Sequence, residues 1–183
     1  MKLGVVLLGL LWSTCSVAGG YYHPMIDTYD PDSGFYYRGV ASQQSSGFIS
    51  STGDGSTENI YIYDPETGKG TYLFPEQDDV KIVTFAIETS VDDGTVQFRG
   101  AHGLPIRNNV NVPDRSVNSR MLVVLRNTET SSETFYFAEK DGTGLVKART
   151  ITADADWHVD VKNSVIRVIE QAGMKLSVES FEW

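Results

Sequence analysis

Two side chains near the C-terminus are of the types that move protons. His158 and Asp160 stand two positions apart in a run predicted to be a strand, so both face one side and Trp157 faces the other. A carboxylate can orient an imidazole for general acid–base chemistry. An exposed His–Asp pair opposite a core tryptophan gives the same pattern, and we favour that interpretation. His158 and Asp160 therefore stay weak catalytic candidates, and we predict that the protein is not an enzyme.

Other catalytic arrangements lack their residues or their spacing. A zinc site needs three or four ligands, usually with two of them close together, but no two of the three histidines (His23, His102 and His158) are closer than 56 positions. The Gly-x-Ser-x-Gly pattern of a serine nucleophile is also missing. We predict no metal site and no cofactor.

Three residues are candidates for binding instead: His102, Tyr36 and Trp157. His102 stands between small residues at the start of a predicted loop over 101–119, and loops of that length often carry function, although a plain connector is the alternative. Tyr36 lies in an aromatic triplet, where consecutive side chains face opposite ways and one face can be exposed to a protein or sugar. Core filling is the alternative for the aromatic residues.

The first 18 residues are typical of a secretory signal peptide. Lys2 precedes an apolar run over 3–12, and small residues at Ser16 and Ala18 fit a cleavage after Ala18. The run is too short to cross a bilayer core of ~30 Å. Anchoring through a lipid on Cys15 is the weaker alternative, because Trp12 is bulky at a position where such signals usually carry an aliphatic residue. We expect the protein to be exported to the periplasm or the extracellular space.

The expected mature chain of 165 residues is acidic and has no cysteine. The net charge of the whole sequence is −9, and loss of Lys2 makes it −10. Such a charge disfavours phosphate backbones and anionic lipid, so we expect no nucleic-acid partner. No later stretch is apolar for long enough to be a transmembrane segment. Stability must come from a packed core, because disulfides are absent.

Short β-branched and aromatic runs alternate with turn residues after residue 35, which is typical of an all-β domain. We predict an extended segment over 19–34 and a single all-β domain over 35–183. The predicted strands cover 59–63, 71–74, 81–89, 95–99, 121–125, 134–138, 157–161, 165–169 and 175–181. The alternating Phe181 and Trp183 are expected to fasten the last strand to the sheet.

A turn sequence is repeated along the chain. Tyr-Asp-Pro-Asp-Ser-Gly at 29–34 recurs as Tyr-Asp-Pro-Glu-Thr-Gly at 63–68, and a degenerate copy begins at Asn127. Asp or Asn starts such a turn by bonding its own backbone, Pro presets φ, and Gly accepts a positive φ. Hairpins repeated in this way suggest radially repeated sheets.

Residues 135–169 resemble one blade of a TolB-type β-propeller. An aromatic strand (135–137) meets an Asp-Gly turn (141–142), and a strand ending in Ile-Thr (151–152), a tryptophan strand at Trp157 and an apolar strand (166–169) follow. The family has Ser-Pro-Asp-Gly after its tryptophan, whereas this chain has other residues there. The resemblance implies a periplasmic setting and protein binding, and it carries no catalytic residue.

The expected fold is an open propeller-like stack of antiparallel hairpins, because the mature chain is too short for four blades and their loops. A two-sheet β-sandwich is the alternative. The expected function is that of an exported, non-catalytic binding or adaptor protein with another protein as its partner. A carbohydrate- or peptide-binding domain comes second, and a small hydrolase using His158 and Asp160 comes third.

Overall fold

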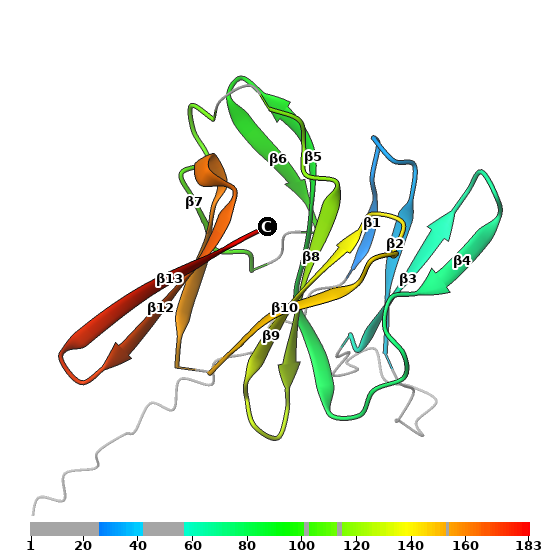
Figure 1. Ribbon diagram of the computed structural model, residues 1–183. Helices are drawn as coiled ribbons and strands as arrows, with labels where there is room; N and C mark the ends of the chain where they lie inside the picture. Colours follow the sequence, from blue (N-terminus) through cyan, green and yellow to red (C-terminus); the bar gives the residue numbers. More distant parts are fainter. Residues whose placement is uncertain (1–25, 42–56, 101–102, 113–114, 153) are drawn as a thin grey trace, which may run out of the picture.

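A computed structural model of the chain describes residues 26–41, 57–100, 103–112, 115–152 and 154–183. In this part of the chain the regular elements are strands, apart from a single 3-10 turn at Val161–Asn163. The strands form three sheets, none of which closes on itself (Figure 1). The all-β prediction is confirmed. Within the described ranges, no helix has the length and apolar character needed to cross a membrane.

The first sheet is antiparallel, and its strands lie side by side in chain order. It consists of β1 (Asp27–Tyr29), β2 (Tyr36–Val40), β3 (Asn59–Asp64) and β4 (Lys69–Tyr72). β1 falls inside the segment over 19–34 that was expected to be merely extended. The sheet therefore begins before residue 35, because Asp27 to Tyr29 pair with β2.

The central sheet is antiparallel and has the spatial order β10-β9-β8-β5-β6. Its strands are β5 (Val80–Asp92), β6 (Thr95–Arg99), β8 (Arg120–Asn127), β9 (Glu133–Glu139) and β10 (Val146–Ile151). The long β5 pairs with β8 through residues 80–86 and with β6 through residues 87–92. Bulges after Ile82 and Glu88 bend this strand, so that it serves both neighbours.

The third sheet is mixed and has the order β13-β12-β11-β7. Its strands are β7 (Ile106–Arg107), β11 (Asp156–Asp160), β12 (Val165–Ala172) and β13 (Lys175–Glu182). β7 runs parallel to β11, and it lies within the predicted loop over 101–119. The described part of that loop therefore supplies the last strand of a sheet.

Two hydrophobic cores lie against the central sheet. On β8, Met121, Val123 and Leu125 belong to the first core, together with Ile60 and Ile62 of the first sheet. The alternate β8 residues Leu122 and Val124 belong to the second core, together with Val159, Ile166 and Val168 of the third sheet. Both faces of β8 are thus buried, which explains its uninterrupted apolar run.

The stretch that resembles a propeller blade is divided between two sheets. Over residues 135–169, β9 and β10 lie in the central sheet, whereas β11 and β12 lie in the third sheet. A propeller blade has its four strands in one sheet. The structure therefore does not show a propeller, and it has three sheets where the sandwich alternative had two.

The repeated turn has the same local geometry in all three copies. The side-chain oxygens of Asp30, Asp64 and Asn127 accept hydrogen bonds from the backbone N–H groups two residues on, at 3.2, 2.8 and 3.0 Å. The fifth residue has a positive φ in each copy: 83° at Gly34, 67° at Gly68 and 57° at Ser131. The turn prediction is confirmed, and the three hairpins are divided between the first and central sheets.

Candidate functional site

The His158 and Asp160 candidates lie on the outer face of the third sheet. Val159 between them is buried in the second core, so the predicted sharing of faces is observed. His158 is half-buried and stands opposite Arg167 of β12. Within the described residues, no hydrogen bond joins His158 to Asp160. The pair is therefore not assembled as an imidazole oriented by a carboxylate.

Asp160 is a buried structural anion. Its carboxylate accepts hydrogen bonds from Asn108 Nδ2 at 3.0 Å, Asn163 Nδ2 at 2.8 Å and Arg167 Nε at 2.9 Å, and Arg167 Nη2 lies 2.8 Å away. Burial alone would raise the pKa of Asp160, but these bonds and the Arg167 charge outweigh it and lower the pKa to about 2. A carboxylate that holds its proton so weakly is a poor base at neutral pH.

Trp157 lies at the rim of the second core. Its ring is half-buried and meets Phe135 edge to face, with 4.9 Å between the ring centroids. Its indole N–H donates to Glu133 Oε2 at 3.1 Å, and Glu133 also accepts from Arg126 Nε at 3.1 Å. The polar edge of Trp157 is thus engaged inside the protein. A ligand would find only the remaining exposed part of the ring.

His102 lies outside the described residues. In the described part of the loop over 101–119, Asn109 accepts from the Val96 N–H and donates to the Val96 carbonyl, both at 2.9 Å. Asn108 reaches Asp160, so side chains fix this segment to β6 and β11. The part of the chain that the structure describes holds no group of three His, Cys, Asp or Glu side chains placed to bind a metal ion.

Tyr36 lies on an exposed sheet surface. Its side chain is 49% exposed, whereas its neighbour Tyr37 is 1% exposed and belongs to the first core. The prediction that consecutive aromatic residues face opposite ways is confirmed at this pair. Tyr36 therefore lies on the outer face of the first sheet, away from the first core.

Tyr36 is one of five tyrosines on that outer face, as the strand register shows. Tyr36 stands opposite Tyr29 of β1 and Tyr63 of β3, and Tyr61 of β3 stands opposite Tyr72 of β4. Residues paired in this way share a face. We call this surface the tyrosine face, and it consists of Tyr29, Tyr36, Tyr61, Tyr63 and Tyr72.

The tyrosines pack against one another, and the described residues leave their hydroxyl groups without hydrogen-bond partners. The ring centroids lie 4.8 Å apart for Tyr29 and Tyr36, and 5.2 Å apart for Tyr61 and Tyr72. Tyr72 is 58% exposed. Within the described residues, none of the five hydroxyl groups forms a hydrogen bond to the protein. Among the described residues, the face thus combines aromatic surface with hydroxyl donors and acceptors that the protein does not use.

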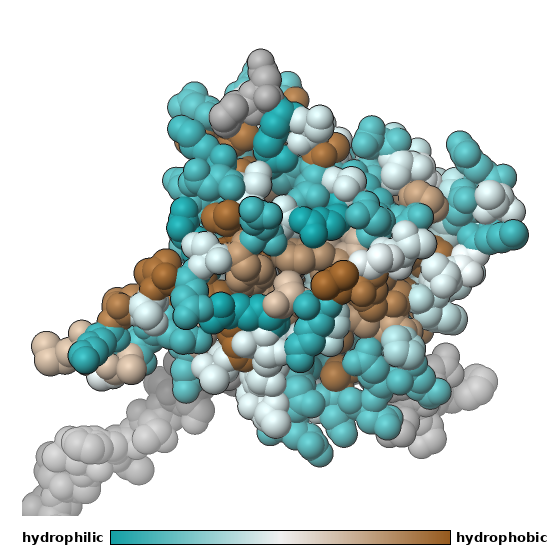
Figure 2. Space-filling model, in the orientation of Figure 1, coloured by the Kyte–Doolittle hydropathy of each residue, from teal (hydrophilic) through white to brown (hydrophobic). Residues whose placement is uncertain are grey.

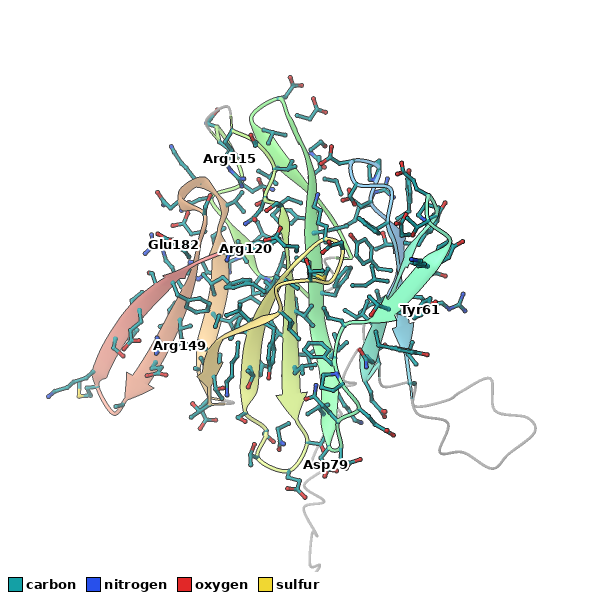
Figure 3. All side chains as sticks on the ribbon, turned by 45° about the vertical axis from the view of Figure 1, so that its right-hand side comes forward. Tyr61, Asp79, Arg115, Arg120, Arg149 and Glu182 are labelled. Carbon is teal, nitrogen blue, oxygen red and sulfur yellow. The ribbon has the colours of Figure 1, made fainter. Side chains whose placement is uncertain are left out.

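A glycine in β4 makes room for one of these rings. Tyr61 lies on the first sheet (Figure 3), and a Cβ atom placed on Gly70 would come within 2.1 Å of the Tyr61 hydroxyl oxygen. The ring therefore extends across the backbone of β4, where a side chain would block it. The sequence alone marks Gly70 as a turn residue, because it lies two positions after the repeated turn.

A hollow of about 500 Å³ adjoins the tyrosine face at Tyr72. Its wall includes Val40, Asn59, Tyr72, Phe74, Glu76 and Gln77. The Asn59 side chain is fixed there, since it donates to the Phe74 carbonyl at 2.9 Å and accepts from the Phe74 N–H at 3.1 Å. The hollow is partly open to solvent, and its wall combines aromatic rings with carboxylate and amide groups.

A buried ion pair connects the first sheet to the central sheet. Lys140 Nζ lies 3.0 Å from Asp30 Oδ2 and donates to the Glu88 carbonyl at 2.9 Å, while the Tyr37 hydroxyl donates to the Lys140 carbonyl at 2.9 Å. Burial alone would raise the pKa of Asp30, but hydrogen bonds from Ser33, Lys140 and the Asp32 N–H, together with the Lys140 charge, lower it. The first copy of the repeated turn is thus fixed to the central sheet.

The comparisons with known proteins add no assignment. No family model matches the chain, and neither a curated protein nor a solved structure matches it.

The sequence signalled part of the tyrosine face. Tyr36 was a binding candidate because of its aromatic neighbours, and Tyr29 and Tyr63 occupy the same position in two copies of the repeat. The repeat predicts turns, and its pattern alone does not indicate that its leading tyrosines gather on one surface. Since β1, β2 and β3 are neighbours, the repeat places these tyrosines on either side of Tyr36.

Proposed function

We propose that this protein is an exported, non-catalytic binding or adaptor protein of the cell envelope or extracellular space, and that its tyrosine face binds another protein. The observation that carries this proposal is the gathering of five tyrosines on one outward sheet face, with their hydroxyls unused by the protein within the described residues. The proposed export rests on the signal-like sequence over 1–18, which lies outside the described residues.

The chemistry of the surface suits a protein partner. Tyrosine buries a large, rigid area with few rotatable bonds and offers a hydroxyl at its end, which is why it is enriched at the energetic centres of interfaces. Asp27 and Arg38 stand opposite each other beside the tyrosines and are exposed. Charged residues at the edge of an aromatic patch are typical of an interface rim.

We also infer that the three sheets form a sandwich-like stack with the central sheet in the middle. The support is that each core joins the central sheet to a different neighbour. In such a stack the flanking sheets each turn one face to solvent. The first sheet presents tyrosines there, which is unusual because the solvent side of an antiparallel sheet is ordinarily polar.

Carbohydrate binding is the second candidate, and the hollow beside Tyr72 favours it. An aromatic ring can stack on the C–H face of a sugar, while carboxylate and amide groups accept and donate hydrogen bonds to its hydroxyls. Tyr72, Glu76 and Gln77 supply these groups around one volume. This candidate uses the edge of the tyrosine face, whereas a protein partner would cover its centre.

The test for a protein partner is a cross-linked pull-down from the native envelope or secreted fraction, with the chain from Gly19 as bait. We expect one stoichiometric partner, lost from a Tyr36→Ala/Tyr63→Ala bait and kept by a Val146→Ala bait. Val146 is 58% exposed on β10, so it serves as a matched control away from the tyrosine face. A partner retained equally by all three baits would reject the tyrosine face as the docking surface.

The carbohydrate candidate is tested by titrating soluble oligosaccharides while tyrosine and tryptophan fluorescence is recorded. Saturable quenching that Tyr72→Ala removes would support it, and no change with any sugar would reject it. If the protein were a hydrolase that uses His158, the His158→Ala variant would lose that activity while it stays folded. We expect His158→Ala to keep all binding, because His158 lies on the third sheet.

A further inference from the structure

β13 is the longest strand edge that the described residues leave without a neighbour. It has eight residues, occupies the end of the third sheet and pairs with β12 without a bulge. The other end strands are shorter: β1, β4, β6 and β7 have three, four, five and two residues, and β10 has six with a bulge after Lys147. Proteins usually shorten, bend or charge such edges to prevent pairing with other chains.

The β12–β13 hairpin also projects from the body of the protein and exposes apolar side chains near its tip. Figure 1 shows it extending away from the other strands, and Figure 2 shows hydrophobic residues along it. Met174, Leu176 and Val178 are 103%, 64% and 57% exposed. Leu176 and Val178 lie on the outer face of the sheet, on the side opposite Phe181, which packs against the second core.

On this edge, the outward-pointing backbone N–H and C=O groups belong to the residues that carry the exposed apolar side chains. Trp183 N–H donates to the Ser164 carbonyl, so the odd-numbered residues of β13 exchange hydrogen bonds with β12. The N–H and C=O groups of the even-numbered residues, Leu176 and Val178 among them, therefore point away from β12. An added strand would find its hydrogen-bonding groups at the residues that carry the exposed apolar side chains.

We propose that β13 pairs with β13 of a second copy of this chain, antiparallel and about a two-fold axis at Ser177. Leu176 of one copy then stands opposite Val178 of the other, and the two exchange backbone hydrogen bonds. On the opposite face, Lys175 stands opposite Glu179 of the second copy. The two third sheets become one continuous sheet, and the interface is isologous because each contact occurs twice.

Charge complementarity selects this register. Antiparallel pairing about a two-fold axis keeps side chains on their own face, so the pairing can shift only in steps of two residues. A two-fold axis at Val178 would place Lys175 opposite Phe181, and an axis at Glu179 would set two carboxylates against each other. The axis at Ser177 is the one of these three that pairs Lys175 with Glu179 and also joins the apolar residues.

The first test is the mass of the chain from Gly19 in solution, by sedimentation or light scattering at concentrations up to ~100 μM. We expect a monomer–dimer equilibrium. In a dimer of Lys175→Glu, both Lys–Glu pairs become Glu–Glu pairs, and we expect self-association to weaken by about 10-fold. In a dimer of Glu179→Lys, both pairs become Lys–Lys pairs. Mixing the two variants restores both opposite-charge pairs, so we expect a heterodimer as stable as the wild-type dimer.

Glu179 also forms an ion pair with Arg149 of β10, which lies beside the hairpin (Figure 3). Circular dichroism and thermal melting of Glu179→Lys therefore check that the variant folds. Restoration in the mixture separates the proposed contact from damage to this internal pair, because misfolded Glu179→Lys could not rescue Lys175→Glu.

The register is tested by disulfide cross-linking. Ser177→Cys places two cysteines opposite each other at a Cα separation of about 4.5 Å, within reach of a disulfide. The only native cysteine is Cys15, in the expected signal peptide. The matched control is Ser180→Cys, whose two copies would lie about 20 Å apart in this register. We expect a covalent dimer from the first variant and none from the second.

A chain that stays monomeric at these concentrations overturns the proposal. A dimer that is indifferent to both charge variants and gives no Ser177→Cys cross-link also overturns it, since the copies would then meet elsewhere. Cross-linking of Ser180→Cys instead would reject the register. The tyrosine-face variants of the proposed function are expected to dimerise normally, so the two proposals succeed or fail separately.

Discussion

The hydroxyl oxygen of Tyr61 lies over Gly70, where a Cβ atom would come within 2.1 Å of it. We expect Gly70→Ala to push the Tyr61 ring off β4 and to weaken binding at the tyrosine face about 10-fold. The midpoint of thermal unfolding should change little, because β4 is an exposed edge strand. Titration of the captured partner or sugar, with melting curves alongside, measures both effects. Lys69→Ala on the same strand is the control, and binding that is equal in both variants would contradict the expectation.

The carboxylate of Asp160 should make the protein sensitive to acid. Its folded pKa of about 2 lies below the ordinary 3.8, so its contribution to stability is fully present above the unfolded value and is lost as pH falls through 4 toward 2. The shift corresponds to about 2 kcal/mol. Asp160→Asn should therefore lower the free energy of unfolding at pH 6 by about that amount and flatten its decline in acid.

Urea denaturation at pH 6 and pH 2 measures this difference for the wild type, Asp160→Asn and a control, Asp156→Asn. Asp156 is exposed on the same strand. If Asp160→Asn and the control declined by the same amount on acidification, the bonds to Asn108, Asn163 and Arg167 would not carry the stability assigned to them.

Replacing Lys140 while Asp30 remains should strongly lower the free energy of unfolding. Lys140→Met leaves the Asp30 carboxylate buried without its cation, and breaking buried pairs in this way typically costs 3–5 kcal/mol, so we expect a loss of about 3 kcal/mol. In Asp30→Asn/Lys140→Met no charge remains uncompensated, and part of that loss should return. Urea denaturation of both single variants and the double variant forms the cycle. Simple additivity of the two losses would show that the residues are not coupled.

Truncating a buried side chain on either face of β8 should lower the free energy of unfolding by a similar amount. Met121→Ala opens a cavity in the first core and Leu122→Ala opens one in the second, and each should cost about 3 kcal/mol. Val146→Ala, at an exposed site, should change the free energy of unfolding by less than ~0.5 kcal/mol. Chemical denaturation compares the three. A small loss at either core residue would show that one face of the central sheet is not tightly covered.

The strands were largely predictable because alternation and turn residues act locally. The predicted strand over 95–99 coincides with β6, and most other predicted strands lie within three residues of the observed bounds. β2 was not among the predicted strands, and β10 entered only as the strand ending at 151–152 in the propeller resemblance. β1 and β7 were missed because three and two residues carry too little pattern, and their pairing is set by distant partners. The division of 135–169 between two sheets was missed for the same reason: consecutive hairpins look alike whether or not they share a sheet.

In the candidate sites too, features set by neighbouring residues were predictable, whereas contacts between residues far apart in the sequence were not. The opposite directions of Tyr36 and Tyr37 follow from strand geometry alone, and so does the shared face of Phe181 and Trp183, which the packing of the sheets turns toward the second core. The role of Asp160 depends on Asn108, which is 52 positions away, and the role of Lys140 depends on Asp30. No local pattern marks such pairs, because the fold alone brings them together.

The two proposed surfaces belong to different sheets, and the central sheet contributes to the cores of both. A ligand on the tyrosine face therefore need not compete with a second copy at β13, and a dimer would present two tyrosine faces at once. On a target with repeated sites, such a dimer gains avidity: once one face is bound, the other searches at a high effective concentration. Linked sites of this kind can raise apparent affinity by about 10²–10⁴ without any new contact. Weak, broad binding by a single tyrosine face would then suffice for tight attachment to a polymeric surface.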